Sequence, residues 1–430
     1  MSSLLVKSAR DTFIALVFLL ATACQTGTQL MPTPAVLVNA IMAPVTAISP
    51  KFQSNKVDVL YATDRNQVAG KPGELHYGAN RSRSLAFGQC TVEIGKNVGW
   101  KSLVELSTTA RRSLTLPLTV GNVIEVGRFP ATPYPLVETP EGLKPDPEYL
   151  EKDECIRHSF QEKLSDMLAL TRRKEVFLLI HGYNNSFEDA VFTIAQFWQF
   201  MGREGVPIAY TWPAGIGGLR GYTYDRESGE FTNYHLKQFL IMLSENPDLQ
   251  KIYIISHSRG TDVCTTALRE LFAEARGAGK TPQSIYKIGN LILAAPDLDS
   301  DVVTQRVSAE RLQLGVDRLT IYTSAFDRAL GLSGWLFQGV KRLGKLGLTD
   351  LTNQEREGLK RNKGVNVINV TSHSGFLGHG YFYSNPCVSA DLILLLRDTR
   401  APGEENGRPL KPLAPGFWEL YAGYPNKKSL

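Results

Sequence analysis

Ser258 has a sequence setting that could support nucleophilic catalysis. It is the middle residue of the motif SHSRG, which follows an apolar run at 252–256 and precedes a stretch of helical periodicity at 261–272. A serine at the tip of a sharp strand-to-helix turn exposes its hydroxyl, and such a turn needs small residues two places before and two places after it. Ser256 and Gly260 occupy those places. We therefore predict that Ser258 is a nucleophile.

A histidine is needed next, because a serine hydroxyl becomes nucleophilic only when a base takes its proton. The chain has seven histidines, and two of them, His373 and His379, lie in the loop after the last strand-like run. The chain order nucleophile, acid, base places the base in that loop. We favour His379, because Gly378 and Gly380 allow a tight loop; His373 is the alternative.

The acid that orients this histidine should follow a strand between the serine and the histidine. Asp327 follows the run 319–323, and Asp297 follows the run 288–294. Asp327 is favoured because its strand lies nearer the histidine, and Asp297 stays open as the second candidate. The aspartates around 297–301 can instead cap a helix that begins there.

Two backbone amides are candidates for an oxyanion hole, the site that would bind the negative charge formed on a substrate carbonyl oxygen. The run 176–180 ends in the motif HGYNN at 181–185. In an arrangement of this kind, the loop after an early strand and the residue after the nucleophile each donate an N–H. This predicts the amides of Tyr183 and Arg259 as donors, each contributing about 3 to 4 kcal/mol of transition-state stabilisation.

The elements that must position these residues form a regular alternation. Short apolar runs separated by amphipathic helical patterns indicate a parallel sheet that is covered on both faces. The predicted fold class is therefore α/β, a mostly parallel doubly wound sheet with helices on both faces and catalytic loops at the carboxyl ends of the strands. The runs are 176–180, 206–212, 252–256, 288–294, 319–323 and 365–370.

The N-terminus has the features of an export signal. Two basic residues precede the apolar run 12–23, which is too short to span a bilayer and has the length of a signal-peptide core. The segment LATAC, which ends at Cys24, resembles a bacterial lipoprotein processing site. The resemblance implies a signal peptide at 1–23, lipidation of Cys24 and anchoring in the bacterial cell envelope, facing the periplasm or the exterior. A plain secretory signal is the alternative.

Composition shifts divide the rest of the chain. We expect a tether at 24–54, an α/β domain at 55–398 and a Pro-rich C-terminal tail at 399–430 that wraps the surface. Within the domain, an N-terminal β region at 55–128 precedes the catalytic core at 174–398. Export permits disulfides, whose pairing the sequence does not assign. The remaining cysteines are Cys90, Cys155, Cys264 and Cys387.

Charge and composition exclude several classes of protein. With 43% hydrophobic and 21% charged residues, the chain is globular and not disordered. Its net charge of +5 comes without a block of Lys and Arg, so we expect no nucleic-acid partner. The cysteine spacing fits no metal pattern, and the predicted chemistry requires no cofactor.

Six motifs in chain order resemble the bacterial α/β-hydrolase family known as domain of unknown function 900: HGYNNSFEDA, TWPAG, SHSRG, LAAPDLD, FDRAL and GHGYF. The segment VDVLYATDRN resembles the start of that family's domain, so the resemblance covers roughly residues 56–397. It implies an α/β-hydrolase fold and an esterase- or lipase-like serine site at Ser258, Asp327 and His379. The chain departs from the family at Ser256 and Arg259, where alanine or glycine and methionine are more usual. Because Arg259 adjoins the oxyanion site, the substrate preference of the family does not simply carry over to this chain.

The resulting hypothesis is a membrane-anchored serine hydrolase of carboxylic esters, with a small-molecule or lipid ester as substrate. An acyltransferase or peptidase would use the same residues, and a non-catalytic envelope lipoprotein that keeps the fold as a binding scaffold is the rival from another class. Residues 328–364 contain a basic amphipathic pattern around Lys341 and Lys345. That segment is a candidate lid or membrane contact, or a helix that packs on the domain.

Overall fold

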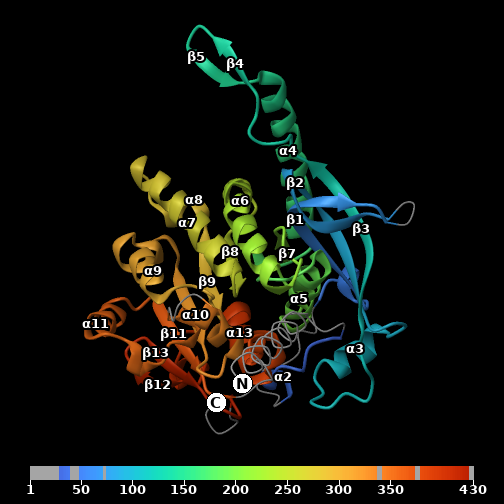
Figure 1. Ribbon diagram of the computed structural model, residues 1–430. Coiled ribbons are helices and arrows are strands. Elements are labelled where there is room, and N and C mark those ends of the chain that lie inside the picture. Colours follow the sequence, from blue (N-terminus) through green and yellow to red (C-terminus); the bar gives the residue numbers. More distant parts are fainter. Residues whose placement is uncertain (1–28, 39–47, 71–73, 337–340, 373–377, 426–430) are drawn as a thin grey trace, which may run out of the picture.

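The computed structural model describes residues 29–38, 48–70, 74–336, 341–372 and 378–425 (Figure 1). Its centre is an eleven-stranded sheet in the order β12-β13-β11-β10-β9-β8-β6-β7-β1-β2-β3. The strands from β13 to β1 run parallel, whereas β2, β3 and β12 pair antiparallel with their neighbours. The bounds are β1 Lys56–Val68, β2 His76–Ile94, β3 Leu118–Arg128, β6 Glu175–Ile180, β7 Val206–Thr211, β8 Lys251–His257, β9 Ile288–Ala294, β10 Arg318–Thr323, β11 Val365–Val370, β12 Lys411–Ala414 and β13 Phe417–Leu420.

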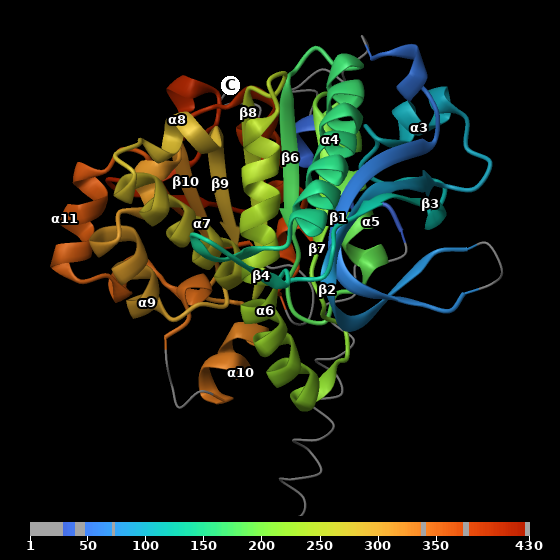
Figure 2. The same cartoon turned by 90° about the horizontal axis from the view of Figure 1, so that it is seen from above.

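Helices cover both faces of this sheet (Figure 2). One buried apolar cluster contains residues of α2, α3, α5, α12 and α13, and a second contains residues of α4, α6, α7 and α8. The predicted α/β architecture is thus confirmed. The bounds are α2 Ala35–Val38, α3 Trp100–Leu106, α4 Pro147–Ala169, α5 Phe187–Phe200, α6 Gly218–Glu245, α7 Gly260–Gly277, α8 Pro282–Tyr286, α9 Ser300–Thr304, α10 Arg328–Leu336, α11 Asn353–Arg361, α12 Tyr381–Ser384 and α13 Pro386–Asp398.

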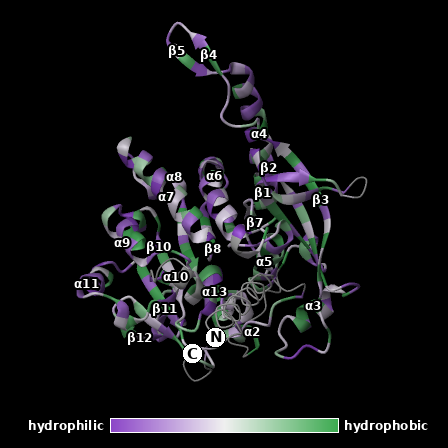
Figure 3. Cartoon of the chain, in the orientation of Figure 1, coloured by the Kyte–Doolittle hydropathy of each residue, from purple (hydrophilic) through white to green (hydrophobic). Residues whose placement is uncertain are grey.

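The central strands form where the sequence is apolar without interruption. All six residues of β7 and all seven of β9 are buried, because a parallel strand covered on both faces has no solvated side. In Figure 3 the hydrophobic colour follows these strands, while the outer helices are mixed. Helix α5 begins at a capping box between Ser186 and Asp189, which fixes the end of the loop that leaves β6.

A narrow arm projects from this body between β3 and β6. It consists of the hairpin of β4 (Leu136–Thr139) and β5 (Gly142–Pro145) and the first part of α4 (Figure 1). Asp146 caps α4 by accepting a hydrogen bond from the amide of Glu148. The segment between β3 and α4, which is rich in proline, therefore contains an ordered hairpin.

The N-terminal segment corrects the expected tether. Residues 29–38 and 48–54 pack on the domain, and Leu30 and Met31 are about as buried as core residues. The guanidinium of Arg112 donates to the carbonyl oxygens of both residues at 2.9 and 2.8 Å. The tether prediction is wrong here, because burying the apolar side chains of this nearly uncharged stretch is more favourable than leaving them exposed in a linker.

The C-terminal residues also differ from prediction. Strand β13 pairs in parallel with β11, and β12 follows as the antiparallel edge, so the tail extends the sheet and does not simply wrap its surface. Arg408 and Tyr424 are fully buried and both bond the carboxylate of Asp391 on α13. A buried charge needs such a partner, and this cluster joins the tail to the domain.

The segment after α10 is not one amphipathic helix. Leu343 and Leu346 are buried, and the amide of Gly344 donates to Pro296 O at 3.0 Å. This part packs on the loop after β9, and residues 337–340 lie outside the described residues. Cys90, Cys155, Cys264 and Cys387 are all free thiols; Cys24 also lies outside the described residues.

Candidate active site

Ser258 lies on a strained turn between β8 and α7. Its φ is 51°, in the left-handed region, which costs on the order of 1–3 kcal/mol for a residue with a side chain. The turn is packed closely against the end of β6: a Cβ on Gly260 would lie 2.1 Å from the carbonyl oxygen of His181, and one on Gly182 would lie 2.8 Å from Cβ of Ser258. Only glycine fits at these two positions without a shift of the backbone.

Three predicted residues meet in one hydrogen-bonded chain. Nε2 of His379 lies 2.7 Å from Oγ of Ser258, and Nδ1 of His379 lies 2.7 Å from Oδ2 of Asp327. Asp327 is completely buried, and His379 is 5% exposed. The other carboxylate oxygen of Asp327 accepts the amide of Leu330 at 3.0 Å, which fixes the carboxylate at the start of α10.

The alternative acid occupies a different environment. The carboxylate of Asp297 accepts hydrogen bonds from the hydroxyls of Tyr222 at 2.7 Å and Ser333 at 2.8 Å. Arg342 forms an ion pair with it at 3.4 Å. These contacts direct Asp297 toward α6 and α10, and the acid beside His379 is Asp327. The alternative base, His373, lies outside the described residues.

Electrostatics tune the histidines of the site differently. Burial by itself lowers the pKa of His379, but the charge and hydrogen bond of Asp327 outweigh burial and raise that pKa above 6.5. Burial lowers the pKa of His257 well below 6.5, and it lowers the pKa of His181 to about 3 with help from the charge of Arg65. His379 is therefore the histidine of this cluster that is suited to accept a proton near neutral pH.

The 181–185 loop, the predicted oxyanion loop, is held on both sides of Tyr183. The amide of Gly182 donates to Asn185 Oδ1 at 3.2 Å, and the amide of Asn184 donates to Asp225 Oδ2 at 2.9 Å. These bonds orient the peptide of Tyr183 between them. Arg259 is the N-cap of α7, where the backbone N–H groups lack partners within the helix and attract negative charge.

Arg65 supports this loop from below, a role that the sequence analysis missed. Its guanidinium is 1% exposed and donates to the carbonyl oxygens of Asn185 and Ala214, each at 2.7 Å. Nη2 also lies 3.2 Å from Nε2 of His181, which is neutral and can accept that bond. The segment ATDRN, which contains Arg65, was the signal, but a charged residue in a strand-like run does not reveal its own burial.

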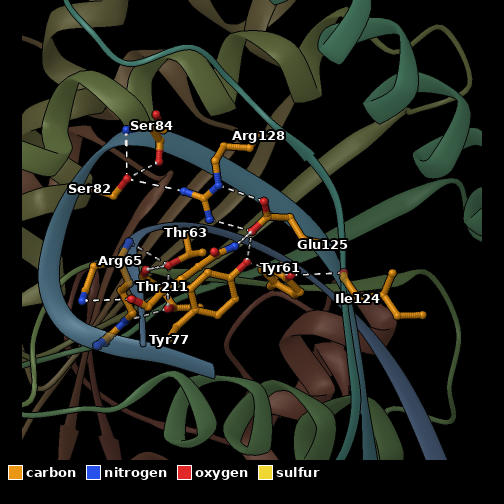
Figure 4. A network of polar contacts seen from close by, with 12 residues as sticks. Tyr61, Thr63, Arg65, Tyr77, Ser82, Ser84, Ile124, Glu125, Arg128 and Thr211 are labelled. Carbon is orange, nitrogen blue, oxygen red and sulfur yellow. Dashed lines mark hydrogen bonds and ion pairs between the residues drawn. The ribbon is translucent and has the colours of Figure 1, made fainter. Parts of the chain in front are cut away.

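Figure 4 shows how Arg65 joins the strands around it. Nε of Arg65 donates to Oγ1 of Thr211 on β7 at 2.8 Å, while Thr63 donates to the carbonyl oxygen of the same threonine. Nearby, Tyr77 donates to Glu125, which pairs with Arg128. The N-terminal strands β1 to β3 thus form one hydrogen-bonded unit with the strands that carry the site.

Asp225 on α6 is the acidic partner of this support. Burial raises its pKa to about 7, against the lowering effects of its backbone bonds and of the charge of Arg65.

Within the described residues, no group of three or more His, Cys, Asp or Glu side chains could hold a metal ion. The helices in this same part of the chain include none that is long and apolar enough to cross a membrane.

The parallel sheet, the strained serine turn and the loops at the carboxyl ends of the strands define an α/β hydrolase. Residues 156–397, more than half of the chain, match the family described as alpha/beta hydrolase of unknown function, DUF900, and the chain belongs to that family. The match begins within α4, so β1, β2 and β3 lie outside it although they belong to the same sheet. No curated protein matches the chain significantly.

Proposed function

We propose that this protein is a serine hydrolase that cleaves carboxylic esters through an acyl-enzyme on Ser258. The observation that carries the proposal is the chain of two 2.7 Å hydrogen bonds from Ser258 through His379 to Asp327. In that geometry a nucleophile, a base and an orienting acid are in contact before any substrate binds.

The steps follow from this contact. Oγ of Ser258 attacks the ester carbonyl carbon while its proton passes to Nε2 of His379, and the amides of Tyr183 and Arg259 stabilise the oxyanion. The carbon–oxygen bond to the leaving group then breaks, and His379 returns its proton to the departing alcohol. Water repeats the sequence on the acyl-enzyme, releases the acid and restores the Ser258 hydroxyl. Asp327 stays ionised and stabilises the imidazolium of His379.

Labelling and turnover test the proposal together. Full-length protein is treated with a fluorophosphonate probe and with p-nitrophenyl esters of graded chain length. We expect both signals to disappear in Ser258→Ala and to persist in the control Ser256→Ala, which changes the other serine of the SHSRG motif, at the end of β8. Turnover should be lost in His379→Ala and kept in His373→Ala. Wild-type protein that neither labels nor hydrolyses any ester would favour the scaffold alternative.

The same machinery would serve an acyltransferase or a peptidase. Adding a nucleophilic alcohol or amine to the ester assay distinguishes a transferase, because the acyl group then leaves the enzyme on that acceptor and not on water. A panel of peptide amides tests the peptidase alternative. Hydrolysis of esters without transfer or amide cleavage is the expected result.

We also propose that the chain is a bacterial lipoprotein anchored through Cys24 in the cell envelope. The support is the apolar run followed by LATAC. Cys24→Ala should abolish lipid labelling and release the protein from the membrane fraction. Unchanged partitioning and mobility of that variant would contradict the proposal.

A further inference from the structure

A cavity of ≈ 360 Å³ opens beside Arg259, the residue that follows Ser258. Helix α6, the first turn of α7, the segment around α9 and Arg342 line it. We call it the arginine pocket, because four of its ten lining residues are arginines: Arg226, Arg259, Arg306 and Arg342.

The arginine pocket holds more positive than negative charge. Its acidic lining residues are Glu230, Asp262 and Asp299, so the formal balance of the lining is 4 − 3 = +1; Arg342 is also paired with Asp297, which does not line the pocket. Two guanidinium groups share one carboxylate: Arg259 lies 2.5 Å from Oδ2 of Asp262, and Arg306 lies 2.7 Å from Oδ1. Asp299 caps α9 by accepting the amide of Asp301 at 2.8 Å.

Two buried donors in this pocket have no hydrogen-bond partner. They are Nε of Arg259 and Nε of Arg306. Arg259 is only 9% exposed, and a charged group buried with an unused N–H loses hydration without compensation. A guanidinium group matches carboxylate and phosphate oxygens in geometry and charge, so an oxyanion in the pocket is suited to pair with the guanidinium groups of Arg259 and Arg306.

Two residues that line the arginine pocket, Arg259 and Tyr222, contact the surroundings of Ser258. Nη1 of Arg259 donates to the carbonyl oxygen of Asp297 at 3.4 Å, and the amide of Asp297 donates to the carbonyl oxygen of Ser258 at 3.3 Å. Tyr222, which lines the pocket, lies against Tyr183 with ring centroids 5.4 Å apart. Through these contacts the lining of the pocket adjoins both the serine turn and the 181–185 loop.

We propose that the arginine pocket binds a carboxylate or phosphate group carried by the ester substrate itself, so that the enzyme prefers anionic esters. This inference rests on the proposed function and specifies its substrate class. Arg226, which is exposed at the rim of the pocket, would attract the anion, and Arg259 and Arg306 would bind it where water is largely excluded.

Matched ester pairs test the preference on the full-length enzyme. The first pair is the 4-nitrophenyl ester of hexanoate and the 4-nitrophenyl monoester of adipate, which differ only in a terminal carboxylate on the acyl chain. The second pair is 4-carboxyphenyl butyrate and its methyl ester, which place the charge on the leaving group. A third pair, with phosphate in place of the carboxylate, separates the two anions.

The readout is the ratio of kcat/KM for the anionic member over the neutral member of each pair. We expect this ratio to exceed ten in at least one pair and to fall about tenfold in Arg306→Met, since a charge-assisted bond is lost. Arg226→Glu, an exposed change that should not impair folding, should also lower the ratio, and its effect should weaken at high salt. Arg269→Met is the matched control, on α7 but outside the arginine pocket.

Failure of this inference differs from failure of the proposed function. Hydrolysis of the neutral esters with a ratio near one in every pair would overturn the anion preference and leave the hydrolase intact. If no ester is hydrolysed, calorimetric titration of Ser258→Ala with inorganic phosphate and with adipate decides the pocket separately. Anion binding that is lost on adding Arg306→Met supports the pocket, and no binding, or binding unchanged by that substitution, overturns it.

Discussion

Replacing Asp327 by asparagine isolates the contribution of the acid beside His379. The carboxylate of Asp327 is completely buried and lies 2.7 Å from Nδ1 of His379. Asparagine keeps the shape but removes the charge that stabilises the imidazolium and the acceptor that sets the tautomer. In serine proteases this change lowers kcat by about 10⁴. At about 1.4 kcal/mol for each factor of ten, that is about 5 kcal/mol of transition-state stabilisation.

The pH dependence of kcat/KM in the same variant is an independent test of the role of Asp327. Neutral His379 is the base, so wild-type activity falls as the pH drops through the pKa of His379, which lies above 6.5. In Asp327→Asn the two effects of Asp327 that raise this pKa are lost, and burial, which lowers it, is then opposed only by the smaller charge effect of Asp297. The acidic limb of kcat/KM should therefore move to lower pH while the plateau falls.

Steady-state hydrolysis of a p-nitrophenyl ester between pH 5 and 9 measures both effects, with Asp297→Asn as the matched control. Asp297 bonds Tyr222, Ser333 and Arg342, so its substitution should cost less than tenfold in kcat. The assignment of Asp327 is refuted if Asp297→Asn costs more than Asp327→Asn. It is also refuted if Asp327→Asn leaves the plateau within tenfold of wild type.

Three further predictions concern the support of the site. Arg65→Met should destabilise the protein by about 3 kcal/mol or more in urea unfolding, because several acceptors lose a buried charged donor. Arg65→Lys should have a lower kcat than wild type, since one ammonium group cannot span these acceptors. A wild-type kcat in Arg65→Lys would contradict this role. Gly260→Ala should lower Tm sharply, because its Cβ would meet a backbone oxygen at 2.1 Å, whereas Gly277→Ala on the same helix meets nothing within 4 Å and should be neutral or stabilising. Equal Tm changes in the two variants would disprove that argument. The pKa of Asp225 is raised by burial from 3.8 to about 7 in the folded state. Between about pH 4 and 7 the folded state therefore keeps a proton on Asp225 that the unfolded state has released, so the free energy of unfolding decreases as the pH rises through this range. The unfolding free energy of Asp225→Asn relative to wild type should thus increase between pH 4 and 8, and a constant difference would exclude the raised pKa.

The fold was predictable where one local pattern dominates. Strands such as β7 and β9 are apolar throughout, so their burial on both faces follows from the sequence. The position of Ser258 at a turn between a strand and a helix was predictable, because its motif falls where a strand pattern changes to a helix pattern. His379 and Asp327 were favoured because the expected order along the chain is nucleophile, acid, base. The sheet brings the loops that carry these residues together, because they follow nearby parallel strands.

The remaining features depend on contacts between distant segments. Strands β12 and β13 lie in a Pro-rich stretch with little strand pattern, and they form because β11 offers an open edge and Asp391 binds Arg408. Arg65 is more than a hundred residues from the 181–185 loop that it supports. The arginine pocket likewise combines α6, α7 and the segment around α9, and no periodicity in the sequence links them.

Most of the titratable groups beneath the 181–185 loop keep one protonation state at neutral pH. Arg65 keeps its proton below about pH 10 even though burial lowers its pKa. The pKa of His181, about 3, and the strongly lowered pKa of His257 keep both rings neutral at neutral pH. A fixed cation therefore lies under the loop where an oxyanion would form. Close to it, the pKa of Asp225 is raised to about 7 by burial, and the pKa of His379, which burial by itself lowers, is raised by Asp327. The acidic limb of kcat/KM should then lose one ionisation in Asp225→Asn and keep the one that belongs to His379.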